Sequence, residues 1–310
     1  MQGSVQRERA ERGGADNERM RELLARVRSI EIRSRRLADT VLTGQYRTAF
    51  RGSGIEFEEV REYISGDEVR SIDWNVTART GRLFVKKYRE ERERNVVMLI
   101  DISASQYFNT RNKSKNELCA ELAAVFALSA LSSKDKIGLI LFSDRIEKTI
   151  MPRRGRSHVL RVIREVLACE PKGKATDIQL ALGHANRVLP HRSIVLVLSD
   201  FFQNPEEYEK ALIYTTLRHD FVPIIIRDPF EESAPPSGVL VVADAETDDL
   251  VPVALSSKAA RAEYAEHSRQ IDAGLKVFLR RHRIDSITVR TGSEYISELA
   301  QFFRRRVARQ

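Results

Sequence analysis

The apolar residues of this chain follow two patterns, short unbroken runs and longer stretches with helical spacing. Residues 96–100 and 194–198 are runs of five apolar residues, which is typical of strands covered on both faces in a parallel sheet. Similar runs predict strands at residues 136–142, 221–226 and 285–289, and an antiparallel edge strand at 146–151. These runs predict the sheet of a sizeable domain.

Between the runs, apolar residues recur every three to four positions, which predicts helices. The predicted helices cover residues 116–133, 153–167, 176–189, 205–217, 256–281 and 294–306, and the Pro-rich stretch 228–253 is predicted as a rim loop with a small hairpin. The first helix is predicted to point Leu118, Leu122, Val125, Phe126 and Leu131 inward. Alternating strands and helices predict an α/β fold, with a doubly wound, mostly parallel sheet flanked by helices.

Four segments are predicted along the chain. Residues 1–16 are polar and form a disordered tail, and residues 17–44 form an amphipathic helix that packs on its own domain or, alternatively, serves a partner or a membrane surface. Residues 45–94 form a small strand and loop extension, in which Trp74 is expected to be a core anchor. Residues 95–310 form the α/β domain.

Polar side chains follow two of the predicted strands at the point where each strand ends. Asp101, Ser103 and Ser105 follow the first run, and Asp200 follows the run at 194–198. Ligands of open α/β sheets collect outside the carboxyl ends of strands, and Mg²⁺ prefers oxygen ligands with one or two carboxylates. The same residue types also make ordinary turns and helix caps, so the pattern leaves both interpretations open.

These residues resemble the metal-ion-dependent adhesion site of von Willebrand factor A domains, in which Asp-x-Ser-x-Ser is followed by a Thr and then an Asp. The resemblance implies that Asp101, Ser103 and Ser105, with Thr176 and Asp200, hold Mg²⁺ or alternatively Mn²⁺ or Ca²⁺. It also implies a Rossmann-like fold of this type.

The segment before the first run contains the motifs Arg51-Gly-x-Gly-x-Glu-Phe, Gly66-Asp67, Ile72-Asp73-Trp74 and Ala78-Arg79. With these motifs the chain resembles a bacterial family catalogued as domain of unknown function 58, and the resemblance covers roughly residues 47–303. Lys174 and Ala175 stand where family members usually have paired glycines. Genes of this family commonly accompany MoxR-type AAA+ ATPases, which implies an adaptor that takes an acidic side chain from a partner protein and works with such an ATPase in the assembly or activation of other proteins.

Composition narrows the function classes. The chain has 310 residues and a net charge of +8, but Arg and Glu alternate, as in residues 89–94, which is typical of solvated faces. Nucleic-acid binding is therefore only an alternative. Cys119 and Cys169 have no zinc or disulfide spacing, and no apolar stretch approaches membrane-spanning length, so a cytoplasmic location is expected.

No catalytic constellation is found, so the chain is expected not to be an enzyme. The enzyme alternative is a Mg²⁺-dependent phosphohydrolase, which needs a second carboxylate two residues after the first, where Ser103 stands. Charged residues of the extension are candidates for acids or anion clamps, but a structural role is favoured for them. They are Asp67, Asp73, Arg51, Arg70 and Arg79.

Overall fold

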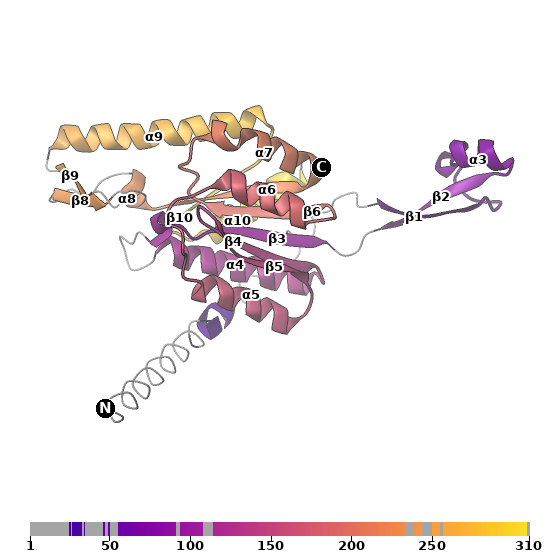
Figure 1. The fold of residues 1–310 in the computed structure, drawn as a ribbon, viewed down its shortest axis with the longest axis horizontal. Coiled ribbons are helices and arrows are strands. Elements are labelled where there is room, and N and C mark those ends of the chain that lie inside the picture. The colour runs from indigo at the N-terminus through magenta and orange to yellow at the C-terminus, as the bar shows by residue number, and fades with distance from the viewer. Residues whose placement is uncertain are drawn as a thin grey trace, which may run out of the picture. The chain divides into compact units, whose positions relative to one another are not determined.

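The computed structural model describes residues 25, 27–32, 34, 46, 49, 55–90, 94–107, 114–232, 239–243, 250–254 and 257–308. The chain divides into two compact units, one made of Met1–Ala49 with Asn95–Gln310 and the other of Phe50–Arg94. We call the first the α/β unit and the second the hairpin unit. Figure 1 shows the two units as ribbons.

A six-stranded sheet forms the centre of the α/β unit, with the strand order β10-β7-β6-β3-β4-β5. All neighbouring strands are parallel except β5, which runs antiparallel to β4 at one edge. The strands are β3 (Asn95–Asp101), β4 (Lys136–Phe142), β5 (Ile146–Arg153), β6 (Ser193–Ser199), β7 (Asp220–Arg227) and β10 (Ile287–Arg290). The predicted mostly parallel α/β sheet is confirmed, including its antiparallel edge strand.

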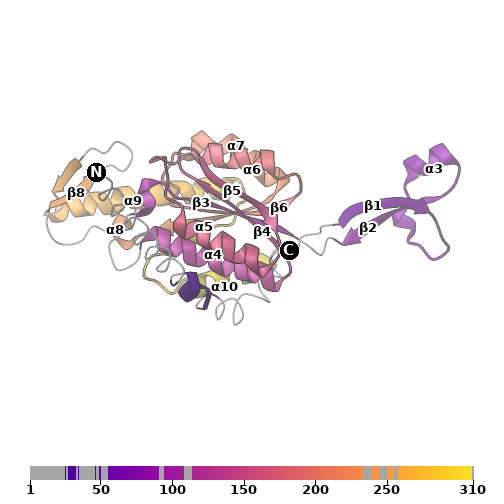
Figure 2. The same ribbon diagram turned by 60° about the horizontal axis from the view of Figure 1, so that its bottom comes forward.

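Helices cover both faces of this sheet. One face carries α6 (Ile178–Val188), α7 (Pro205–Arg218) and α9 (Lys258–Arg281), and the other carries α4 (Lys115–Ser132), α5 (Arg156–Ala168) and α10 (Ile296–Val307) (Figures 1 and 2). Local sequence fixes where several of them begin. Ser114 and Glu117 form a capping box at the start of α4, and Asn204 caps α7 ahead of Pro205.

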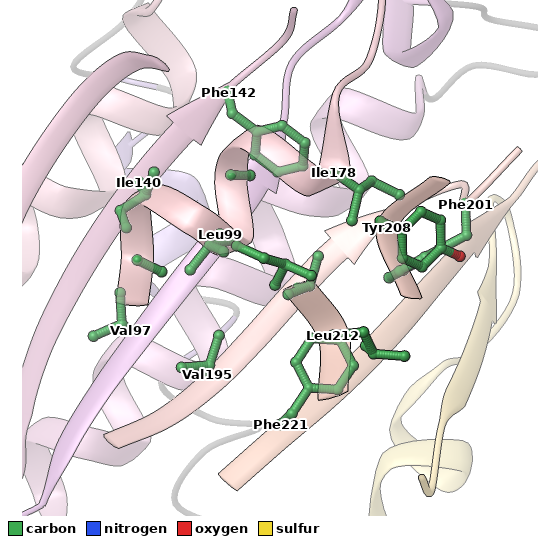
Figure 3. Packing of buried hydrophobic residues seen from close by; sticks show 14 of the residues in the cluster. Val97, Leu99, Ile140, Phe142, Ile178, Val195, Phe201, Tyr208, Leu212 and Phe221 are labelled. Carbon is green, nitrogen blue, oxygen red and sulfur yellow. The ribbon is translucent and has the colours of Figure 1, made fainter. Parts of the chain in front are cut away.

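The core on the first face is built from strand residues that point towards α6, α7 and α9. Val97, Leu99, Ile140 and Phe142 of the sheet pack against a single continuous cluster that includes Tyr208 (Figure 3). All of these side chains are at most 1% exposed. Because β3 lies in the middle of the sheet, its carboxyl end is held rigidly between two well-packed layers.

Helix α4 is buried almost all round rather than along one face. The prediction of an inward stripe was therefore too narrow, and Leu131, which it included, is only partly buried. The ring of Phe126 meets Phe303 of α10 edge to face with centroids 6.4 Å apart, and Phe303 meets Tyr46 at 6.2 Å. This second layer over α4 explains why its outer residues are also apolar.

The amino-terminal part of the chain is described only in places. The predicted tail at residues 1–16 lies outside the described residues, and within 17–44 the described residues 25, 27–32 and 34 are helical. Val27 is 8% exposed, and Arg156 of α5 pairs with Glu31 at 2.9 Å. These contacts place the helix against its own α/β unit.

The Pro-rich stretch near the sheet rim contains α8 (Pro229–Glu232) and an antiparallel hairpin of β8 (Val239–Ala243) and β9 (Leu250–Ala254). This arrangement agrees with the predicted loop and small hairpin, apart from the short helix α8. Among the described residues, no helix combines the length and apolar character needed to cross a bilayer.

The hairpin unit consists of β1 (Ile55–Glu62) and β2 (Phe84–Glu90), which pair antiparallel, with η2 (Val69–Ser71) and α3 (Trp74–Thr80) between them. Two carboxylates fix the connection. Asp67 accepts two hydrogen bonds from Arg61, at 2.7 and 2.8 Å, and Asp73 caps α3 by accepting from the amides of Asn75 and Val76. These contacts support the structural role that the sequence favours for both aspartates.

Trp74 does not anchor a core, and that prediction was wrong. Its side chain is 65% exposed. It occupies the first position of a helix of only seven residues, none of which is buried within the described part of the chain, and the neighbouring Asp73 takes the inward position. Arg70 and Arg79 are exposed as well, and Arg51 lies outside the described residues.

Candidate metal site at the carboxyl edge of the sheet

The five residues predicted as metal ligands lie in one hydrogen-bonded network at the carboxyl ends of β3 and β6. Thr176 Oγ1 lies 2.8 Å from Ser103 Oγ and 3.2 Å from Asp101 Oδ2. The hydroxyls of Ser103 and Ser105 are 3.1 Å apart, and Ser105 Oγ donates to Asp200 Oδ2 at 3.0 Å. Three loops that are distant in the sequence therefore converge on a single cluster of oxygens.

Asp101 ends β3 and is completely buried. Its Oδ1 accepts from the amide of Ser103 at 2.9 Å, and its Oδ2 accepts from the hydroxyl of Ser199 at 2.7 Å. Burial, together with the nearby carboxylate of Asp200, raises the pKa of Asp101 to about 6. A cation bound at this site would compensate the charge of this buried carboxylate.

The loop that carries Thr176 is held in place by its neighbours. Lys174 O accepts from the amide of Ala104 at 3.0 Å, and the amide of Asp177 donates to Ser143 O at 3.0 Å. Asp177, not Thr176, caps α6 by accepting from the amide of Leu180 at 2.8 Å. The hydroxyl of Thr176 thus makes no cap and points into the site.

Gly173 allows the loop that carries Thr176 to lie close to the side chains of Asp144 and Ser143. A Cβ atom at position 173 would lie 2.1 Å from Asp144 Oδ1 and 2.3 Å from Ser143 Oγ. The amide of Gly173 also donates to Glu147 Oε1 at 2.8 Å. A larger residue at position 173 would force the side chains of Asp144 and Ser143 to move, so the glycine one residue before Lys174 lets the loop pass close to them.

Asp200 has partners that the sequence pattern did not reveal. Its Oδ2 accepts from Lys115 Nζ at 2.8 Å and from Gln106 Nε2 at 3.1 Å, in addition to Ser105. Lys115 also contacts Glu231 of α8, with Nζ 2.5 Å from Oε1. Burial alone would lower the pKa of Lys115, but the carboxylates of Asp200 and Glu231 outweigh it and raise the pKa, so the ammonium stays charged.

A second buried cation holds the backbone at Asp200. Arg227, 1% exposed, donates from Nη1 to the carbonyl of Asp200 and from Nε and Nη2 to Asp272 of α9, at 2.9 and 2.6 Å. Its guanidinium lies 4.5 Å from the centroid of the Phe202 ring. The loop after β6 is therefore fixed by both side-chain and backbone contacts.

The donor set fits a hard divalent cation. It consists of two carboxylates and three hydroxyls, and Gln106 adds a buried Oε1 with no hydrogen-bond partner. Among the described residues, no group of three His, Cys, Asp or Glu side chains is placed to bind a metal. An all-oxygen set rich in hydroxyls suits Mg²⁺, Mn²⁺ or Ca²⁺ better than Zn²⁺, which favours nitrogen and sulfur ligands.

Comparison with known proteins gives relatives of unknown function. Uncharacterized protein Rv1480 of Mycobacterium tuberculosis and Uncharacterized protein Mb1516 of Mycobacterium bovis are each 26% identical to the chain over 282 residues, which cover 90% of the chain and 88% of each relative. No activity can be carried over from these relatives.

Among solved structures, an aerotolerance-related membrane protein from Bacteroides fragilis matches 70% of this chain and all of its own, with 16% identity and a TM-score of 0.45. A von Willebrand factor type A protein from Catenulispora acidiphila matches 73% of this chain and 43% of its own, with 13% identity and a TM-score of 0.37. The family described as "Protein of unknown function DUF58" matches residues 59–273, which is more than half of the chain. The chain therefore belongs to the DUF58 family.

Proposed function

We propose that this protein is a metal-dependent binding adaptor, whose Mg²⁺ is held by Asp101, Ser103, Ser105, Thr176 and Asp200. The supporting observation is the convergence of these five side chains, from three separate loops, into one network at the carboxyl edge of the sheet. Mg²⁺ takes about six oxygen ligands and usually keeps several waters. Such an ion leaves a position at which an Asp or Glu of a partner protein can bind.

The chemistry of the site supports recognition rather than bond breaking. The residue two positions after Asp101 is Ser103, whose hydroxyl contacts Thr176 and Ser105. A phosphohydrolase of the type weighed above would need a carboxylate there to move a proton to the leaving group. The ion, when bound, would supply a positive charge that attracts an outside carboxylate, while the chain's residues orient it.

The family resemblance leads to a proposed partner, a MoxR-type AAA+ ATPase, with other proteins as the clients of assembly or activation. In this proposal the α/β unit presents the metal to an acidic side chain of the ATPase or of a client. Metal occupancy would then control binding, since removal of the ion removes the contact.

The first experiment is a magnesium titration of the protein and of Asp101→Ala, followed by calorimetry and thermal unfolding. At a hundredfold excess of Mg²⁺ over Kd, the wild-type protein should gain about 2.7 kcal/mol of stability, and Asp101→Ala should gain none. Asp67→Ala, which removes a carboxylate of the hairpin unit, is the matched control and should respond like the wild type. A wild-type protein that ignores Mg²⁺, Mn²⁺ and Ca²⁺ would contradict the metal site.

The partner is tested separately, by binding a purified MoxR-type ATPase of the same organism in Mg²⁺ and in EDTA. Binding should require Mg²⁺ and be lost in Asp101→Ala. Equal binding in EDTA would show that the metal site is not the contact. Phosphoester hydrolysis that disappears in Asp101→Asn would instead favour the enzyme alternative.

A further inference from the structure

Lys115 places a permanent positive charge beside the candidate metal ligands. Its side chain is 0% exposed, and its ammonium lies between Asp200, which is 3% exposed, and Glu231, which is 13% exposed. Burying an ammonium costs several kcal/mol unless carboxylates compensate for it, and here two do so. The other buried positions of α4 are mostly apolar, so Lys115 is unusual among them.

The ammonium binds one oxygen of a carboxylate whose charge a metal at this site would also draw on. Asp200 Oδ2 already accepts three hydrogen bonds, from Ser105, Gln106 and Lys115. Its other oxygen, Oδ1, has only a long contact of 3.4 Å to the amide of Phe202. A divalent cation that draws on the charge of Asp200 must therefore compete with Lys115.

Glu231 links this competition to another part of the fold. It lies on α8, and while its Oε1 contacts Lys115, its Oε2 accepts from the amide of Asp228 at 2.9 Å. Glu231 therefore shares the charge of Lys115 with Asp200. The stronger the hold of Glu231 on the ammonium, the more of the Asp200 charge is left for a metal.

We propose that Lys115 is a built-in counter-cation that sets the metal affinity of the site, and that Glu231 on α8 tunes it. The inference rests on the metal site of the proposed function. In this arrangement Lys115 keeps the metal-free protein stable, because it compensates two buried carboxylates, and it weakens metal binding by competing for one of them. Contacts that move α8 would change the affinity without touching a metal ligand.

The proposal predicts opposite effects from two neighbouring substitutions. Lys115→Met removes the competing charge, so the Kd for Mg²⁺ should fall at least about tenfold. Glu231→Gln removes the carboxylate that draws the ammonium away from Asp200, so the Kd should rise by at least about threefold. A Lys115 with a purely structural role would lower the melting temperature in both variants and leave the Kd unchanged.

The experiment is isothermal titration of Mg²⁺ into the full chain and each variant, with thermal unfolding of the metal-free proteins in parallel. Lys115→Gln, which keeps a hydrogen-bond donor without the charge, replaces Lys115→Met if that variant does not fold. Lys148→Met is the matched control, because Lys148 makes a partly exposed ion pair with Glu165 at 3.6 Å and should not alter the Kd.

The outcomes separate this inference from the proposed function. No Mg²⁺ binding by the wild-type protein would overturn the metal site itself. Binding by the wild type, with Kd values for the Lys115 and Glu231 variants that are unchanged or shifted in the same direction, would overturn the counter-cation and leave the metal site standing. Opposite shifts would support both.

Discussion

In the α/β unit, every residue from Val96 to Ile100 is at most 1% exposed, whereas in the hairpin unit Val85 is the single buried apolar side chain among those described. The first unit is stabilised by a two-sided core, and the second by an antiparallel pair, a bidentate Arg61–Asp67 contact and the Asp73 cap. A two-stranded hairpin alone is marginally stable in water. The comparison shows that rigidity is concentrated in the α/β unit, which carries the candidate ligands. The hairpin unit carries none of them and leaves apolar surface exposed.

The largest effect should come from the core. Leu99→Ala removes a fully buried side chain beneath Asp101 and should lower the free energy of unfolding by about 3–5 kcal/mol, because the packed layers on both sides cannot close the cavity. Urea unfolding followed by circular dichroism measures this loss. A loss below about 1 kcal/mol would contradict the rigid two-sided core.

The stability of the two units should respond differently to acid. Burial lowers the pKa of His219 in the α/β unit to about 4, and its Nδ1 accepts from the amide of Ser193 at 3.2 Å. Since the ring has a pKa near 6.5 in the unfolded chain, its contribution is fully present above pH 6.5 and is lost as the pH falls to about 4, which amounts to about 3 kcal/mol. The raised pKa of Asp101 contributes in the opposite direction over the same range, so the loss should appear in the difference between the wild-type protein and His219→Gln when unfolding is measured against pH.

The hairpin unit should respond to acid at lower pH. The hydrogen bonds from Arg61 lower the pKa of Asp67 below its usual 3.8, so this contribution persists above pH 3.8 and is lost only as the pH falls through the lowered value. Proton NMR of residues in the hairpin unit, recorded between pH 6.5 and 4, should show little change. If both units unfolded together between pH 6.5 and 4, the predicted difference in their response to acid would be wrong.

The next largest loss of stability among the substitutions is expected from Gly173→Ala. The added methyl group collides with Asp144 and Ser143, so the Thr176 loop must shift, at a cost of about 1–3 kcal/mol. The Mg²⁺ affinity of the proposed site should weaken as well. Gly183→Ala is the control, because nothing lies within 4 Å of a Cβ atom at that position. Equal behaviour of the two variants would show that the loop is not held by Gly173.

The smallest effect is expected for Trp74. Because its side chain is 65% exposed, Trp74→Ala should change the free energy of unfolding by less than about 0.5 kcal/mol. Chemical unfolding followed by circular dichroism, which does not depend on the indole, provides the measurement. A loss of about 2 kcal/mol or more would mean that the indole is buried after all.

The sequence predicted the sheet from local patterns, and it predicted the five candidate ligands from such patterns together with the resemblance to von Willebrand factor A domains. The run at 96–100 identifies a buried strand, and the spacing of Asp101, Ser103 and Ser105 is visible without any tertiary information. Lys115 and Glu231 could not be found this way, because they lie 116 residues apart and nothing around either one marks it as buried. Trp74 was predicted wrongly because the general tendency of tryptophan to be buried says nothing about whether a seven-residue helix has a surface to pack on.

The hairpin unit is also an insertion, since the α/β unit resumes on both sides of residues 50–94. Ile55 and Glu90 are paired across the hairpin at its base, so the chain departs and returns at neighbouring points. A segment with adjacent ends can be cut out and replaced by a few glycines, or transplanted into another scaffold. The protein is thus organised so that evolution, or an engineer, can exchange the hairpin unit while the α/β unit is inherited intact.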